Sequence, residues 1–218
     1  MNQINFLESL PKVSRNLELR AKVKSEALIL EAKKFGENYF DGDRSTGYGG
    51  YTYDGRWRSV AKRIIQHYGI KPGMKILDVG CAKGFLVKDF MLEEPSIEVY
   101  GLDISEYALF NCEPEVVGRL HLGSAVNLPF PNSSFDCVVS INTLHNLPRS
   151  GVIKAIAEIE RVSKGRSFVQ VDSYFSNHQK ELFEKWVLTA EYHDFPEKWL
   201  ETFQEAGYSG DYDWTVVE

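Results

Sequence analysis

The sequence predicts an α/β protein built on a mostly parallel sheet with helices on both faces. Short apolar segments alternate with amphipathic ones between residues 74 and 171. A loop of small residues follows the first apolar segment, and an acidic residue ends the second. Alternating strands and helices imply right-handed crossovers and parallel strands, and a small-residue turn from strand to helix is typical of nucleotide-binding sheets.

The chain ahead of this pattern is expected to be a helical cap followed by a loop. From Pro11 to about Phe35, apolar side chains recur among Glu and Lys at spacings of three, four and seven, which predicts helix. Residues 41–57 contain five glycines and predict irregular structure. We therefore divide the chain into an extension with a lid loop, 1–57, and a main domain, 58–218.

The main domain is expected to begin with an amphipathic helix and to end with a shortened strand region. Only one strand is visible after Asp172, and the other elements alternate in type. The expected strands are 74–79, 98–102, 119–122, 135–141, 167–171 and 214–217. The expected helices are 58–67, 85–91, a short one from Ser105, 152–162, 179–189 and 197–206.

Composition favours a small acceptor over a macromolecule. The net charge of −6 provides no global basic field for nucleic acid. The three cysteines lack metal-ligand spacing and suit reduced thiols. Without a signal-like start or an apolar run of about 18 residues, we expect a cytoplasmic protein, off the membrane and without a metal, that can form a homodimer.

The residues that carry chemistry begin at Ile76, where the chain reads Ile-Leu-Asp-Val-Gly-Cys-Ala-Lys-Gly. Small residues in this turn let a ligand approach the backbone, although the same turn can simply pack a helix on a strand. Nineteen residues after Gly84, Asp103 ends the next strand, where a carboxylate can accept hydrogen bonds from ribose hydroxyls. A polar turn at residues 123–130 then precedes the buried strand 135–141.

Together these features resemble the class I S-adenosylmethionine-dependent methyltransferase family, over roughly residues 70–175, and imply its Rossmann-like fold. The loop 48–57 also resembles one in uncharacterised bacterial methyltransferases of a small-molecule or sugar type. Two departures are Ala82 at the usual middle glycine and Ser124 where many relatives carry aspartate. The cofactor residues implied by the resemblance are Asp78, Gly80, Ala82, Gly84, Asp103, Ile104, Ser124, Ala125, Leu128 and Asn142.

Candidate residues for the acceptor follow the fourth and fifth strands and the lid loop. His145 stands where a general base would meet an acceptor hydroxyl, and the alternative is a structural hydrogen bond. Asp172 and Tyr174 either face the acceptor or cap a helix. The lid candidates, whose alternative is packing on the domain, are Tyr51, Tyr53, Arg56 and Trp57.

The function expected from these residues is methyl transfer from S-adenosylmethionine to O or N of a small polar acceptor. An arginine among aromatics suits a sugar nucleotide, and equally a carboxylate. A non-catalytic or regulatory cofactor-binding protein remains open, as does a nucleic-acid or protein methyltransferase. An NAD-dependent oxidoreductase is disfavoured because the loop lacks the G-x-G-x-x-G spacing.

Overall fold

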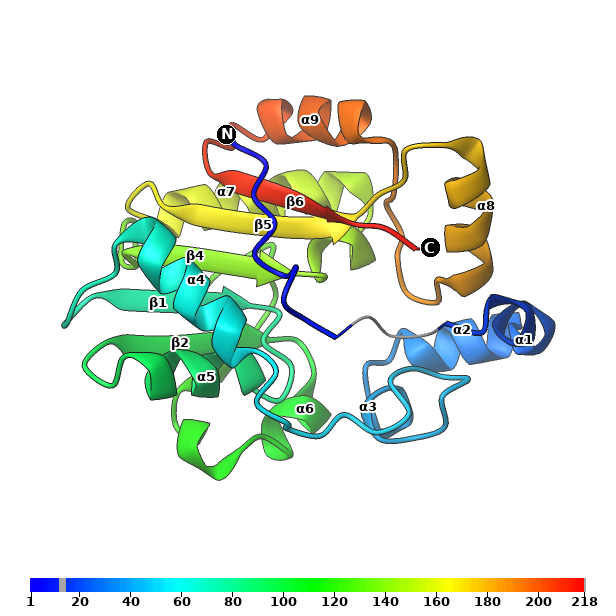
Figure 1. Ribbon diagram of the computed structural model, residues 1–218, viewed down its shortest axis with the longest axis horizontal. Coiled ribbons are helices and arrows are strands. Elements are labelled where there is room, and N and C mark those ends of the chain that lie inside the picture. The colour runs from blue at the N-terminus through cyan, green and yellow to red at the C-terminus, as the bar shows by residue number, and fades with distance from the viewer. Residues whose placement is uncertain (12–14, 218) are drawn as a thin grey trace.

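The computed structural model describes residues 1–11 and 15–217, which form one six-stranded sheet flanked by helices (Figure 1). The strand order is β3-β2-β1-β4-β5-β6, and every pair is parallel. This confirms the expected α/β architecture. The strands are β1 Lys75–Val79, β2 Glu98–Asp103, β3 Leu120–Leu122, β4 Cys137–Ile141, β5 Ser167–Asp172 and β6 Asp211–Thr215.

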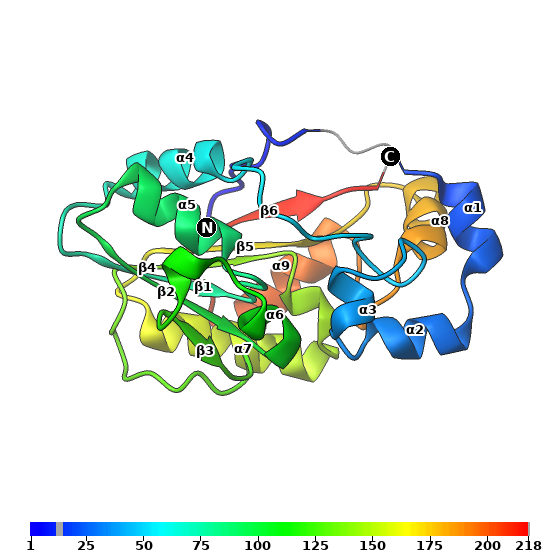
Figure 2. The ribbon, with the colours of Figure 1, turned by 90° about the horizontal axis from the view of Figure 1, so that it is seen from below.

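Helices cover both faces of the sheet, with α4 and α5 on one face and α7 and α9 on the other (Figure 2). The first pair packs on the sheet through residues such as Ile64 and Phe90, and the second through Ile156 and Trp199, all fully buried. The α-helices are α1 Leu17–Val23, α2 Glu26–Ala32, α3 Glu37–Phe40, α4 Arg58–Tyr68, α5 Phe85–Glu93, α6 Glu106–Phe110, α7 Arg149–Val162, α8 Asn177–Trp186 and α9 Pro196–Glu205. Two short 3₁₀ helices are η1 Pro114–Val116 and η2 Leu144–Asn146.

The expected N-terminal helix is divided into α1 and α2, and its first residues, 12–14, lie outside the described residues. Lys24 is extended, and Ser25 then caps α2 by accepting a hydrogen bond from the Leu28 backbone N–H at 3.3 Å. A side-chain cap of this kind begins a new helix. α2 ends at Ala32, and Phe35, with a φ of +49°, lies in the turn that separates it from α3.

The single strand expected after β5 is present, but it begins three residues earlier than predicted and runs parallel to its neighbour. Phe168 pairs with Asp211 and Asp172 with Thr215. The outer edge of β6 is covered by the N-terminal segment, where the Ile4 backbone N–H donates to the Tyr212 carbonyl at 2.9 Å. Covering an edge strand in this way satisfies its free backbone groups.

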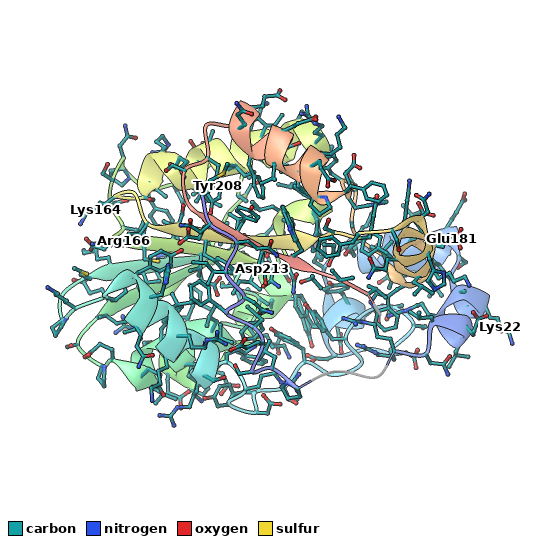
Figure 3. All side chains as sticks on the ribbon, turned by 45° about the horizontal axis from the view of Figure 1, so that its top comes forward. Lys22, Lys164, Arg166, Glu181, Tyr208 and Asp213 are labelled. Atoms are coloured by element: carbon teal, nitrogen blue, oxygen red, sulfur yellow. The ribbon has the colours of Figure 1, made fainter. Side chains whose placement is uncertain are left out.

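The carboxyl ends of the strands all lie at one end of the molecule, where the helices of the extension also gather. In Figure 3, Lys164 and Arg166 mark the amino end of β5, whereas Glu181 of α8 and Lys22 of α1 lie at the opposite end. Since the strand order reverses between β1 and β4, a binding crevice is expected at this end. Within residues 1–11 and 15–217, no helix has both the length and the apolar character that crossing a bilayer requires.

Candidate functional site

A cavity lies at the switch point between β1 and β4, between the carboxyl ends of the strands and the segment 35–57. This location is where ligands bind in open α/β sheets. Its floor comes from loops that follow β1, β2, β3 and β4, and its roof from the extension. The lining residues are Phe35, Tyr39, Phe40, Tyr48, Tyr51, Trp57, Asp78, Gly80, Cys81, Ala82, Leu86, Leu102, Asp103, Ile104, Gly123, Ser124, Ala125, Ile141, Asn142, Thr143, Asn146 and Leu147.

The glycine loop after β1 is held tightly against the ends of β2 and β4. Gly80 has a φ of +86°, and a Cβ at this position would overlap the Thr143 side chain. Ala82 also has a positive φ, +49°, and its backbone N–H donates to Asp103 Oδ2 at 2.7 Å. Only glycine fits the first position, whereas alanine fits the second at a small cost.

Two carboxyl groups, Asp78 and Asp103, flank this loop and are both largely buried. Asp103 accepts backbone N–H groups from Ala82 and, at 2.8 Å, from Ser105, which partly offsets the burial that raises its pKa. Burial, with the nearby Asp103 charge, raises the pKa of Asp78 to about 8, and no hydrogen bond from the described chain opposes this shift. Asp78 therefore has no cationic or hydrogen-bond-donating partner in the described chain. A ligand with a cationic or donor group could supply one.

The wall beyond Asp103 is apolar and accessible. Ile104 is 61% exposed although it is a large aliphatic residue that lines the cavity, and Ser124 and Ala125 face the same space. Ser124 Oγ accepts the Val126 backbone N–H at 3.4 Å and so shapes this turn. An exposed aliphatic side chain beside a buried carboxyl group offers an apolar surface to a flat ligand.

The roof is an aromatic lid, which we define as residues 35–57. The Tyr51 ring stacks on Phe85 of α5, with centroids 4.6 Å apart and planes 17° apart. A buried lysine in the glycine loop, Lys83, pairs with Asp41 of the lid at 2.6 Å and also donates to the Tyr51 carbonyl at 3.0 Å. Tyr107 Oη adds a hydrogen bond to Asp41 at 2.7 Å. The lid is thereby latched onto the loop that it covers.

The far end of the cavity is lined by residues that follow β4. Asn142 has a φ of +53°, and its Oδ1 accepts the Thr215 hydroxyl of β6 at 2.6 Å. Asn146 of η2 also lines the cavity, and its Oδ1 is buried without a hydrogen-bond partner in the described part of the chain. A buried carbonyl oxygen left unpaired is costly, so this atom marks a place for a donor on a ligand.

His145 does not line the cavity. Its Nδ1 accepts the Asp172 backbone N–H at 3.1 Å, and its Nε2 lies 3.3 Å from Asp172 Oδ2. This pattern fixes a neutral imidazole with the proton on Nε2, so no ring nitrogen is left to take a proton from an acceptor. Burial lowers the pKa of His145 and raises that of Asp172, and the attraction between the two groups opposes both shifts.

Several other predicted residues also lie outside the cavity lining. Gly84 caps α5 and packs near Val116, and Leu128 is buried in the core between the sheet and α7. Tyr174 is buried against Phe183 of α8.

Two of the four lid candidates are turned to other partners. Tyr53 Oη donates to Asp89 at 2.5 Å, and Arg56 forms an exposed pair with Asp54 at 2.6 Å. Tyr51 and Trp57 line the cavity.

Eight of the ten cofactor residues expected from the sequence line the cavity, but most of the lid residues that line it were not expected. Phe35 follows the helical stripe in spacing and was expected to pack within the cap, and Tyr39 and Phe40 fall between that stripe and the glycine-rich loop. The signal that was available was aromatic density: six of the cavity residues are aromatic, and all six fall within residues 35–57. The lining residues that were not predicted are Phe35, Tyr39, Phe40, Tyr48, Cys81, Leu86, Leu102, Gly123, Ile141, Thr143, Asn146 and Leu147.

A glycine loop at the switch point of a doubly wound sheet, with one carboxyl at the end of β1 and another at the end of β2, defines the class I methyltransferase fold. Residues 77–169 match the family described as methyltransferase domain, so this segment is a methyltransferase domain of the S-adenosylmethionine-dependent kind. A domain of this kind uses S-adenosylmethionine as its cofactor.

Curated relatives match part of the chain. A demethylmenaquinone methyltransferase from Lysinibacillus sphaericus is 32% identical over 152 residues, which cover 66% of this chain and 60% of the relative. A sterol 24-C-methyltransferase from Gibberella zeae is 36% identical over 118 residues, which cover 49% of this chain and 30% of the relative. The chain thus spans less than two thirds of the length of either relative.

Solved structures share the fold at low identity. A SAM-dependent methyltransferase from Archaeoglobus fulgidus aligns with a TM-score of 0.54 at 20% identity, covering 69% of this chain and 68% of that one. A [4+2]-cyclase aligns with a TM-score of 0.56 at 19% identity, covering 95% of this chain and 75% of that one. The fold is therefore shared by proteins with different reactions, and the site has to decide the activity.

Proposed function

We propose that this protein transfers a methyl group from S-adenosylmethionine to a small-molecule acceptor. The observation that carries the proposal is the pair Asp78 and Asp103 on either side of the Gly80 loop, because one carboxyl lacks a partner and the other is held in place by backbone N–H groups. The names of the curated relatives support a small acceptor rather than a macromolecule.

The residues present fit this cofactor along the length of the cavity. Asp103 would accept the ribose hydroxyls with the lone pairs that its two backbone donors leave free, and Asp78 would pair with the amino group of the methionine part. Ile104, Ser124 and Ala125 would contact the adenine. When bound, the cofactor supplies an electrophilic methyl group on a sulfonium.

The chain's own contribution to such a reaction is alignment and the exclusion of water. The aromatic lid closes over the cavity, and the Lys83 and Asp41 pair fixes it to the glycine loop. Holding two reactants in line inside a closed site lowers the activation free energy by several kcal/mol. No general base is needed when the acceptor is readily deprotonated.

A sugar nucleotide is not part of this proposal. That expectation rested on the resemblance of the loop 48–57 and on Arg56, and Arg56 is paired with Asp54 at the surface and does not line the cavity. Transfer to O or to N remains compatible with the floor of the site.

The test is calorimetric titration with S-adenosylmethionine, S-adenosylhomocysteine and NAD. We expect the first two to bind and Asp103→Ala to weaken them at least about tenfold, since hydrogen bonds to a charged group contribute about 1.5–3 kcal/mol each. Asp136→Ala, just before β4 at the opposite end of the sheet and paired with Lys164, is the matched control. Binding of NAD alone, or of none of the three, would refute the proposal.

Formation of S-adenosylhomocysteine during turnover separates an enzyme from a regulatory binding protein. We expect S-adenosylhomocysteine to accumulate when acceptors are supplied to the wild type. Under the same conditions, we expect no accumulation with Asp103→Ala. Because a [4+2]-cyclase shares the fold, cofactor binding without any turnover across a broad acceptor panel would contradict the transferase assignment.

A further inference from the structure

We infer that the acceptor is an uncharged aromatic compound with a phenolic hydroxyl, held between the aromatic lid and the residues that follow β4. This inference rests on the proposed function and narrows its acceptor. Three properties of the cavity lead to it: the charge of its lining, the shape of its roof, and the kind of polar group at its far end.

The charge of the lining disfavours an anionic acceptor. Among the described residues that line the cavity, none is lysine, arginine or histidine, whereas Asp78 and Asp103 are acidic. Lys83 lies nearby, but both Asp41 oxygens and the Tyr51 carbonyl already accept its hydrogen bonds. An acceptor with a phosphate or carboxylate would enter this space without a counterion, which is unfavourable in a water-excluded site.

A group of three arginines lies outside the lining. The guanidinium groups of Arg15, Arg20 and Arg44 lie 5.6, 4.7 and 5.3 Å from the ring centroid of Trp186 of α8, outside the lining of the cavity. A long anionic acceptor that reached these arginines is the alternative that the experiment below must exclude.

The roof favours a flat apolar molecule. All six aromatic residues of the cavity belong to the lid, and they include Tyr39, Tyr48 and Trp57. Tyr48 and Phe40 have nearly parallel rings, 5.9 Å apart with an interplanar angle of 18°. Aromatic side chains arranged in this way bind a planar ring by offset or edge contacts.

The far end of the cavity offers a carbonyl oxygen that can accept a hydrogen bond, and the described residues there offer no general base. Asn146 Oδ1 is buried and unpaired in the described chain, and a phenolic O–H would satisfy it. His145, the nearest imidazole, has both ring nitrogens engaged by Asp172. A carboxamide orients a hydroxyl group but does not remove its proton. The hydroxyl of the methyl acceptor must therefore be acidic by itself. A phenol, with a pKa near 10, meets this condition, whereas a sugar hydroxyl does not.

The atoms balance without another reagent. An oxygen lone pair of the phenol forms the new O–C bond, and the S–C bond of the cofactor breaks with its electron pair left on sulfur. The phenolic proton leaves to water at the mouth of the cavity. The products are the aryl methyl ether, S-adenosylhomocysteine and one proton.

The experiment measures binding to the protein saturated with S-adenosylhomocysteine, followed by NMR or calorimetry. The probes are 2-naphthol, naphthalene, 6-hydroxy-2-naphthoate and UDP-glucose. We expect 2-naphthol to bind at least about tenfold more tightly than either anion and about fivefold more tightly than naphthalene, the second factor being the effect of one hydrogen bond. With S-adenosylmethionine in place of the product, we expect 2-methoxynaphthalene to form.

Variants identify the atom involved. Asn146→Leu should remove the preference for 2-naphthol over naphthalene, whereas Arg149→Ala, at an exposed pair with Glu205 outside the cavity lining, should leave that preference unchanged. Tighter binding or faster methylation of the carboxylate or of UDP-glucose than of 2-naphthol would overturn the inference, as would no binding of 2-naphthol to the loaded protein. If S-adenosylhomocysteine itself does not bind, the proposed function fails first.

Discussion

Replacing Asp78 by asparagine should make the protein without cofactor more stable, and the gain should grow with pH. Asp78 is buried at the end of β1, and no hydrogen bond from the described residues supports its charged form. Its pKa is about 8 in the folded protein, against 3.8 as the ordinary value. Asparagine has nearly the same shape and carries no charge, so the substitution removes the titration without opening a cavity.

The sign of the effect follows from proton counting. Between pH 3.8 and 8, the folded state holds a proton on Asp78 that the unfolded state has lost, so the free energy of unfolding falls as pH rises. One proton corresponds to about 1.36 kcal/mol per pH unit. From pH 5 to pH 8, the wild type should therefore lose about 4 kcal/mol relative to Asp78→Asn, with little further change above pH 8.

The assay is urea unfolding followed by tryptophan fluorescence, at half-unit steps from pH 5 to pH 8. Asp136→Asn is the matched control, because the Lys164 ammonium and the Lys75 backbone N–H lower the pKa of Asp136, which therefore stays ionised throughout this range. Its difference from the wild type should not change with pH. A difference for Asp78→Asn that is equally flat would refute the reasoning, and saturating cofactor should reduce the slope by pairing the carboxylate.

Three further predictions concern the loop, the latch and the histidine. Gly80→Ala should cost at least about 2 kcal/mol of stability in thermal unfolding and abolish cofactor binding in calorimetry, because its Cβ overlaps Thr143; normal binding would contradict this. Lys83→Met should leave Asp41 without its cationic partner, lower the free energy of unfolding by about 2 kcal/mol and speed proteolysis of the lid, and an unchanged cleavage rate would argue against a latch. His145→Gln should keep kcat within about tenfold of the wild type, whereas loss of a general base would cost about 100-fold or more.

The sheet was predictable because its signals are local. The apolar run of β1, the small residues after it and Asp103 at the end of β2 each depend on a few neighbours in sequence, and all three lie where they were expected. The path of β6 was less predictable. Its parallel pairing with β5 and its coverage by the segment around Ile4 join residues that are far apart in sequence. No periodic pattern in the sequence indicates such contacts.

The acceptor side was predicted less well, because the same residue types serve both structure and chemistry. An arginine among aromatics looks the same in sequence whether it faces a cavity or, like Arg56, its neighbour Asp54. A histidine after a strand looks like a base until its two nitrogens are followed to Asp172. Only the three-dimensional partners distinguish these roles.

The floor and the roof of the cavity come from different parts of the chain, which explains why the relatives do not indicate the acceptor. The family match, residues 77–169, contains Asp78, Asp103 and the rest of the cavity floor. The six aromatic residues of the roof all come from residues 35–57, outside that match. A chain can therefore keep the floor and change its acceptor by changing the extension alone, and exchanging the lid between two such proteins should exchange acceptor preference while cofactor affinity stays nearly constant.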